Sequence, residues 1–191
     1  MHKSERTKND MIKAVIELID MTSSIDFTIN QIANKANVAV GLINYHYKSK
    51  KDLIIDAVKQ YIEEYIKEEN LVMQNVKQEP ERMLKSSFKS YADFLVKHQV
   101  ISQLYIKYCF DGVIESGSLK QAVEYYIPII GDMNNKLSEE QIMIILKMIS
   151  STIQTSFLET HLVRTSTGFD FYDKNQRDKL IDDMFSLIFK K

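Results

Sequence analysis

Apolar residues recur three and four positions apart along almost all of this 191-residue chain, and no strand-like alternation persists for more than a few residues. Only two prolines and five glycines interrupt the pattern, far fewer turn-forming residues than a sandwich or a barrel requires. Hydrophobic residues make up 45% of the chain, enough for a buried core. The sequence therefore predicts an all-α fold of about nine helices.

Two predicted helix starts carry a complete capping signal. Thr28 is followed three residues later by Gln31, and Ser138 is followed by Gln141 in the same way. We expect the second start to open the longest helix, which reaches about residue 164. A further start is expected at Ser118 with Gln121, and Pro128 should kink or end that helix near residues 125–126.

The first of these starts opens two short helices joined by a tight turn. Asn37 stands at the turn, where its side chain tolerates the left-handed backbone conformation. A long helix, opened by Ser49 and Asp52, follows at once, which is the arrangement of a helix-turn-helix. The inward positions are apolar and can lock the two helices together: Ile32, Ala33, Ala36, Val38 and Ile43. Six outward positions are left for the major groove of DNA: Val40, Gly41, Leu42, Asn44, Tyr45 and His46.

The run from Thr28 to Leu53, TINQIANKANVAVGLINYHYKSKKDL, resembles the signature of the TetR/AcrR family of repressors, and Ile12 and Ala14 stand at the family's apolar positions in the preceding helix. The resemblance covers about the first 55 residues. It implies phosphate contacts at four positions: Thr28, Tyr45, His46 and Lys50. It further implies that the start of the second helix approaches the bases: Ala39, Val40, Gly41, Leu42 and Asn44. Three positions depart from the family pattern, which most often has Gly at Asn37, Ser or Thr at Ala39 and an aromatic residue at Asn44.

Each of these assignments has a simpler alternative. Tyr45, His46 and Tyr47 could form a partly buried aromatic cluster, and we expect Tyr47 to be core in either case. Lys48, Lys50 and Lys51 could be a solvated helix start that supplies counterion-release affinity without reading sequence.

Charge is distributed unevenly along the chain. Residues 1–51 contain eight Lys and Arg against five acids, while the whole chain has a net charge of −1. A basic end on an acidic body is typical of a polyanion-binding module joined to a sensing or dimerising body. We therefore expect a DNA-binding domain over residues 1–51 and a helical effector-binding and dimerisation domain over residues 52–191.

The second domain is rich in aromatic residues that could line a largely apolar effector pocket. The candidates are Tyr61, Tyr65, Phe88, Tyr91, Tyr105, Tyr108, Tyr126, Met148 and Phe157. The alternative is that these residues are simply core. Cys109, the single cysteine, is interpreted as a small buried hydrophobe.

The last two long helices carry apolar stripes that are the predicted dimer interface. The stripe residues assigned to it are Ile149, Ile153, Phe157, Leu180, Met184, Leu187 and Ile188. They could also be buried within one subunit. The family resemblance favours a bundle of four helices, two from each chain.

Other classes of protein find little support in the sequence. His98 and His161 are far apart, so no metal site is expected, and no cofactor motif is present. A catalytic trio of His98, Cys109 and Asp111 has nothing to position a base, so the chain is predicted not to be an enzyme. The lone cysteine and the lack of an apolar leader or membrane span indicate a cytoplasmic protein.

The predicted function is thus a homodimeric DNA-binding regulator, by resemblance a repressor, that a small effector releases from a palindromic operator. Two alternatives stay open: a regulator without a small effector, and a helical adaptor protein. The effector, the operator and the choice between repression and activation are left undetermined by the sequence.

Overall fold

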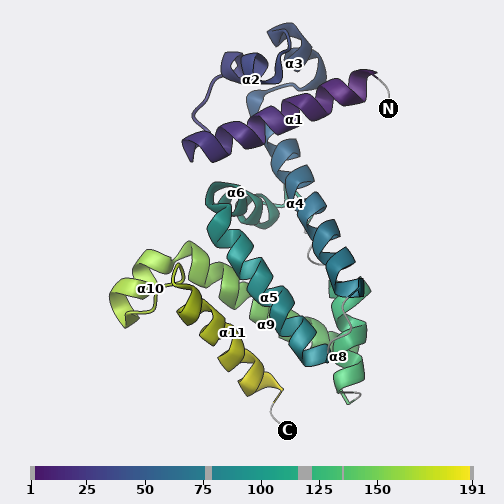
Figure 1. Cartoon of the computed structure of the whole chain (residues 1–191), viewed down its shortest axis with the longest axis vertical. Coiled ribbons are helices and arrows are strands. Elements are labelled where there is room, and N and C mark those ends of the chain that lie inside the picture. The colour runs from purple at the N-terminus through teal and green to yellow at the C-terminus, as the bar shows by residue number, and fades with distance from the viewer. Residues whose placement is uncertain (1–2, 76–78, 116–121, 135, 190–191) are drawn as a thin grey trace. The chain divides into compact units, whose positions relative to one another are not determined.

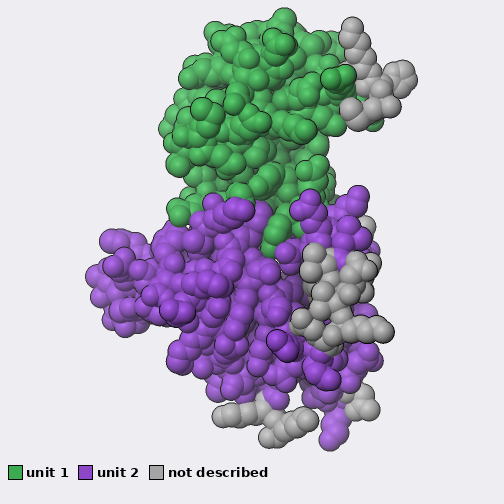
Figure 2. Space-filling view, viewed as in Figure 1, with its two compact units in different colours: residues 1–65, 98–115 green, residues 66–97, 116–191 purple. Residues whose placement is uncertain are grey.

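The structure, a computed structural model, describes residues 3–75, 79–115, 122–134 and 136–189. Over these ranges the chain forms ten α-helices and one π-helical turn, with no strand (Figure 1). The all-α prediction is confirmed. The chain divides into two compact units, residues 1–65 with 98–115 and residues 66–97 with 116–191 (Figure 2).

Unit 1 contains the predicted helix-turn-helix. Its helices are α1 (Lys3–Thr22), α2 (Ile29–Ala36), α3 (Val40–His46), the first part of α4 (Lys50–Asn75) and α6 (Gln99–Phe110). Figure 1 shows α2 and α3 on one side of α1. The core of the unit is built from apolar residues spaced three and four apart on α1 and α4, together with single anchors from the short helices: Met11, Val15, Ile19, Ile32, Ile43, Leu53 and Ala57.

Unit 2 is formed by the last part of α4, α5 (Pro80–Lys97), the π-helical turn η1 (Ala122–Tyr126), α8 (Ile127–Met133), α9 (Glu139–Leu158), α10 (Thr160–Thr167) and α11 (Lys174–Ile188). Helices α5, α9 and α11 pack on one another (Figure 1). The buried stripes of these three helices make the core: Leu84, Phe88, Leu95, Ile149, Ile153, Phe157, Ile181 and Phe185.

The local signals predicted from the sequence are present. Thr28 accepts from the amide of Gln31 and the Gln31 side chain accepts from the amide of Thr28, and Ser138 and Gln141 make the same pair of bonds. Pro128 lies in the first turn of α8, directly after the π-helical turn, so it does mark a helix boundary. The start expected at Ser118 and Gln121 lies outside the described residues.

Two boundaries differ from the prediction. The helix that starts at Ser138 ends at Leu158 rather than near residue 164, because Glu159 leaves the helical region with φ −101° and ψ 15°. The break allows the hydroxyl of Thr160 to accept from the amide of Phe171 over 3.3 Å, and the Phe171 ring packs at 6.1 Å from that of Phe157. The longest helix is α4, with 26 residues. It runs straight through the expected domain boundary at residue 51, and the compact unit that holds the helix-turn-helix continues to residue 65.

Within the described part of the chain, α9 is one helix whose length and hydropathy would suit a membrane-spanning segment. Core helices satisfy the same criterion, and α9 contributes a buried stripe to unit 2.

Candidate nucleic-acid interface

The turn between α2 and α3 adopts the predicted left-handed conformation. Asn37 has φ 54° and ψ 46°, and the amide of Val38 donates to the carbonyl oxygen of Ala33 over 2.9 Å. These bonds satisfy the last carbonyls of α2 and fix the direction in which α3 begins. The backbone of a helix-turn-helix is therefore in place.

One side of α3 faces the unit and the other faces solvent. Ile43 is fully buried, whereas Gly41, Leu42, Asn44 and Tyr45 are exposed. Ala39 is exposed as well, while Val40 and His46 are half-buried. A Cβ added to Gly41 would meet nothing within 4 Å, so packing inside the subunit does not require a glycine there. The predicted outward set thus lies on the open side of α3 or at its edge.

Tyr45 is the most prominent side chain of this surface, with 80% of its area exposed. Its ring contacts that of His46 edge to face, with centroids 5.1 Å apart. A large aromatic residue held on the surface of a seven-residue helix stabilises the subunit little. It is therefore available to an external partner.

Two of the residues predicted to contact phosphates make hydrogen bonds within unit 1. The hydroxyl of Thr28 caps α2, although the residue is exposed. Lys50 is half-buried, and its Nζ donates to the carbonyl oxygens of Ile25 and Phe27 over 3.0 Å and 2.8 Å. Since an ammonium group has three protons, at most one is left for a phosphate. A phosphate at Lys50 would therefore compete with these two carbonyl oxygens for the ammonium group. The sequence did not reveal these two bonds.

Tyr47, the residue on which α3 ends, is buried as expected. Its hydroxyl donates to Oδ2 of Asp56 over 2.8 Å, and Nζ of Lys8 lies 2.8 Å from the same oxygen. The sequence does not reveal this group, because α1, the end of α3 and α4 are brought together only by the tertiary structure.

The pKa values of Asp56 and Tyr47 are shifted in opposite directions. Burial works to raise the pKa of Asp56, but hydrogen bonds from Lys8, Gln60 and Tyr47 outweigh it, so that the pKa is lowered. The pKa of Tyr47 is raised, first by burial and then by the hydrogen bond to Asp56. A carboxylate therefore faces a neutral phenol near neutral pH.

The predicted effector residues divide between the two units. Tyr61, Tyr65, Tyr105 and Tyr108 belong to unit 1, where the Tyr61 hydroxyl lies 3.3 Å from Nδ1 of His98. Unit 2 holds the other five: Phe88, Tyr91, Tyr126, Met148 and Phe157.

Four of the five in unit 2 are built into its interior contacts. Phe88 and Tyr126 have centroids 5.6 Å apart, and the Tyr126 hydroxyl lies 2.7 Å from that of Ser87. The Tyr91 hydroxyl accepts from the amide of Gln154 over 2.9 Å. Met148 is 56% exposed on α9, so it lies on the surface of the subunit rather than inside it.

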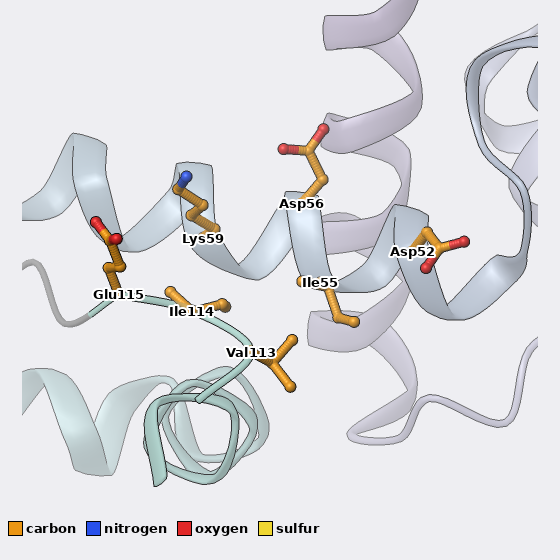
Figure 3. Close-up of a pocket in the computed structure, with 7 residues that line it drawn as sticks. All are labelled: Asp52, Ile55, Asp56, Lys59, Val113, Ile114 and Glu115. Atoms are coloured by element: carbon orange, nitrogen blue, oxygen red, sulfur yellow. The ribbon is translucent and has the colours of Figure 1, made fainter. Parts of the chain in front are cut away.

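A hollow of about 620 Å³ lies in unit 1, between α4 and the segment after α6. Its lining residues are Asp52, Ile55, Asp56, Lys59, Val113, Ile114 and Glu115. Figure 3 shows Ile55 and Val113 directed into the space between the two segments, while the carboxylate of Asp56 is directed to the other side of α4. The hollow is open and mostly polar, and none of the predicted effector residues lines it.

The residues assigned to the dimer interface also divide into two groups. Ile149, Ile153 and Phe157 are fully buried inside unit 2, with Phe157 only 1% exposed, so they cannot touch a second chain as the subunit stands. Leu180, Met184 and Ile188 are half-buried, and Leu187 is exposed. The stripe on α9 that is apolar and exposed contains Ile144 and Met148 instead. Both faces of α9 are apolar, which is why the pattern alone could not tell them apart.

The described residues include no group of three His, Cys, Asp or Glu side chains placed to hold a metal ion. Cys109 is half-buried, and burial raises the pKa of its thiol, which disfavours the nucleophilic thiolate.

A helix-turn-helix in the N-terminal part of an all-α chain, with the outer side of its second helix exposed, is the arrangement typical of DNA-binding regulators of transcription. Residues 25–57 match the family model of bacterial regulatory proteins, tetR family. The predicted resemblance is confirmed over these residues.

Solved structures share the fold at low sequence identity. A TetR-like transcriptional regulator from Rhodococcus sp. RHA1 is 14% identical, with a TM-score of 0.61 and 100% of both chains covered. The fatty acid degradation regulator FadR from Bacillus halodurans is 17% identical, with a TM-score of 0.63 over 94% of this chain and 93% of that one. FadR from Bacillus subtilis in complex with stearoyl-CoA is 19% identical, with a TM-score of 0.55 over 91% and 96%. No curated protein sequence matches the chain.

Proposed function

We propose that this protein is a homodimeric repressor that binds a palindromic operator through α3 and leaves it when a small, largely apolar effector binds unit 2. The observation that carries the proposal is the exposed side of α3, where Tyr45 and Asn44 stand beside Gly41. Gly41 is the second residue of this short helix, where glycine has a low helix propensity, and a Cβ there would meet nothing within 4 Å, so internal packing does not require glycine. Close approach of the helix to a DNA groove would account for it.

Asn44 is the residue on this surface best suited to reading a base. Its side-chain NH2 can donate to N7 of adenine while its carbonyl oxygen accepts from the N6 amino group, a bidentate pair that discriminates by about 1–3 kcal/mol against other bases. Leu42 and Tyr45 supply apolar area for a thymine methyl group and the sugar backbone. Phosphate contacts are proposed for Thr28, Tyr45 and His46. Lys50 has at most one proton left for a phosphate, because its Nζ already donates to two backbone carbonyls.

Dimerisation is proposed through the exposed apolar residues of α9 and α11. Ile144 and Met148 are one helical turn apart on α9, and Leu187 is 75% exposed on α11. An isolated subunit gains nothing from exposing this surface. Two copies of it would form a four-helix contact with twofold symmetry. Binding to a palindromic operator then requires the two α3 helices to reach successive major grooves, roughly 34–36 Å apart.

The effector is proposed to be a molecule with a long apolar part. One protein with this fold is a fatty acid degradation regulator, and another, the transcriptional regulator FadR from Bacillus subtilis, was solved in complex with stearoyl-CoA. The core of unit 2 contains aromatic residues on α5 and η1, Phe88 and Tyr126 among them, and residues of this kind suit an apolar chain with a few orienting polar contacts. We propose that the protein acts in the cytoplasm, where its DNA lies.

The test is a binding experiment with the DNA upstream of the protein's own gene. Sequence-specific binding that weakens steeply with salt supports a regulator, and no binding even at low salt supports the alternative of a helical adaptor. Addition of stearoyl-CoA, as a first apolar probe, should release the DNA. Specific DNA binding that no apolar probe affects would support a DNA-binding regulator and contradict the proposed apolar effector.

A further inference from the structure

The carboxylate of Asp56 in α4 gathers donors from three segments of unit 1. Tyr47, at the end of α3, donates its hydroxyl proton to Oδ2 over 2.8 Å. Lys8 of α1 places its Nζ 2.8 Å from the same oxygen. Gln60, one turn further along α4, donates from Nε2 to Oδ1 over 3.0 Å. Segments that are far apart in the sequence therefore meet at one side chain.

Helix α3 has few other means of holding its orientation. It is seven residues long, and Ala39 at its start makes no side-chain capping bond. Ile43 is the residue of this helix that is fully buried. A single buried side chain fixes the depth of a short helix but leaves the helix free to rotate about that side chain. Tyr47, four residues later and 8% exposed, supplies a second anchor.

The second anchor is directional as well as apolar. The Nζ of Lys8 lies 5.7 Å from the centroid of the Tyr47 ring, so the ring is held by a cation on one side and its hydroxyl by a carboxylate at the tip. A hydrogen bond to a charged acceptor is stronger and more demanding in geometry than one between neutral groups. It therefore limits rotation of the ring, and with it the pivot of α3.

We infer that Asp56 is a positioning residue for DNA recognition: through Tyr47 it sets the angle of α3, and hence the sequence specificity of binding, without touching DNA. The inference rests on the proposed function, since it concerns how well the outward side chains of α3 meet base edges. Non-specific binding depends on phosphate contacts and tolerates small changes of angle. Loss of the Asp56 bond should therefore lower specific affinity far more than non-specific affinity.

The experiment compares two variants on two duplexes. Tyr47→Phe removes the hydroxyl and keeps the ring, and Asp56→Asn keeps the size of the side chain and removes its charge. The specific probe is a duplex that the wild-type protein selects from a randomised pool, and the second probe is the same duplex with its bases scrambled. Each variant should bind the selected duplex about tenfold more weakly, with affinity for the scrambled duplex unchanged. Both changes remove the bond between Tyr47 and Asp56, so the double variant should bind the selected duplex no more weakly than the single variant that binds it more weakly.

Two controls separate this role from others. Glu63→Gln makes the same charge change on the exposed side of α4 and should leave both affinities as in the wild type. Tyr45→Ala alters the proposed DNA-contacting surface itself and should lose specific binding.

Each outcome decides a different point. If the wild type does not select any sequence, the proposed function fails. If the wild type and Tyr45→Ala behave as expected but Tyr47→Phe and Asp56→Asn keep specific affinity within about twofold, the positioning role is overturned. Equal weakening on both duplexes together with a lower thermal midpoint also overturns it, since that pattern reports only a loss of folded protein.

Discussion

The Nζ of Lys50 donates a hydrogen bond to the carbonyl oxygen of Phe27 over 2.8 Å and lies 5.5 Å from the centroid of the ring of the same residue. The start of α4 is thereby tied to the residue before the cap of α2. A lysine whose position in the sequence suggests a phosphate contact serves here to close the helix-turn-helix on itself.

We predict that Lys50→Met lowers the free energy of unfolding of unit 1 by about 1–2 kcal/mol, because two backbone carbonyls lose a charged donor. The salt dependence of DNA binding should stay nearly unchanged if the role of Lys50 is to anchor. Denaturant titration measures the first effect, and binding constants at several salt concentrations measure the second.

Lys48→Met and Lys51→Met are the matched controls for this prediction, since both residues are exposed. A residue that contacts a phosphate contributes a slope of about 0.9 to the dependence of log affinity on log salt. A decrease of that size in the slope for Lys50→Met would support the phosphate contact predicted from the sequence.

Tyr45→Ala should weaken operator binding about tenfold or more and leave helicity, stability and dimerisation as they are. The reason is that the side chain is largely exposed and is not part of the core. Circular dichroism and fluorescence anisotropy on the same sample check both halves of the prediction. Intact operator binding would count against the proposed placement of α3.

Replacement of Asn37 by alanine should destabilise the protein by about 1 kcal/mol, because φ of 54° places a Cβ in an unfavourable position that asparagine tolerates better. Asn37→Gly is the control and should be close to neutral, since glycine has no Cβ. Thermal or urea unfolding of the two variants gives the comparison, and equal stability of Asn37→Ala and wild type would show that the turn relaxes.

Asp93 should make unit 2 sensitive to acid. Burial works to raise its pKa, but hydrogen bonds from Arg177 and Lys174 outweigh burial and lower it. A folded-state pKa below the unfolded value means that this stabilisation is present above the unfolded pKa, about 4, and is lost as the pH falls through the folded one. Urea unfolding between neutral pH and pH of about 3 should show a decline that is smaller in Asp93→Asn. An identical pH dependence in the two proteins would exclude this carboxylate as a cause.

Met148→Glu should convert the proposed dimer to a monomer, because it places a charge on the exposed apolar stripe of α9. Lys147→Glu, on an exposed neighbouring position of the same helix, is the control. Sedimentation measures the mass of each variant. If the Met148→Glu variant remains dimeric, the exposed stripe of α9 is not the dimer interface.

The features that the sequence predicted correctly are local ones. The bonds of Thr28 with Gln31, the left-handed Asn37 and the outward direction of Tyr45 involve residues at most a few positions apart. Helical geometry alone brings such residues together, so residue type and spacing suffice to predict the contact.

The features that the sequence did not predict depend on which elements meet. Tyr47 reaches Asp56 nine residues away, Lys50 reaches back 23 residues to Phe27, and Arg177 contacts Asp93 across 84 residues. Helix α9 is apolar on more than one face, and only the packing of α5 and α11 decided that Ile149 and Ile153 point inward. Spacing along the chain determined the helices and the recognition surface. The angle at which that surface is held, and the faces left open, followed from tertiary packing, because long-range contacts have no periodic signal in a single sequence.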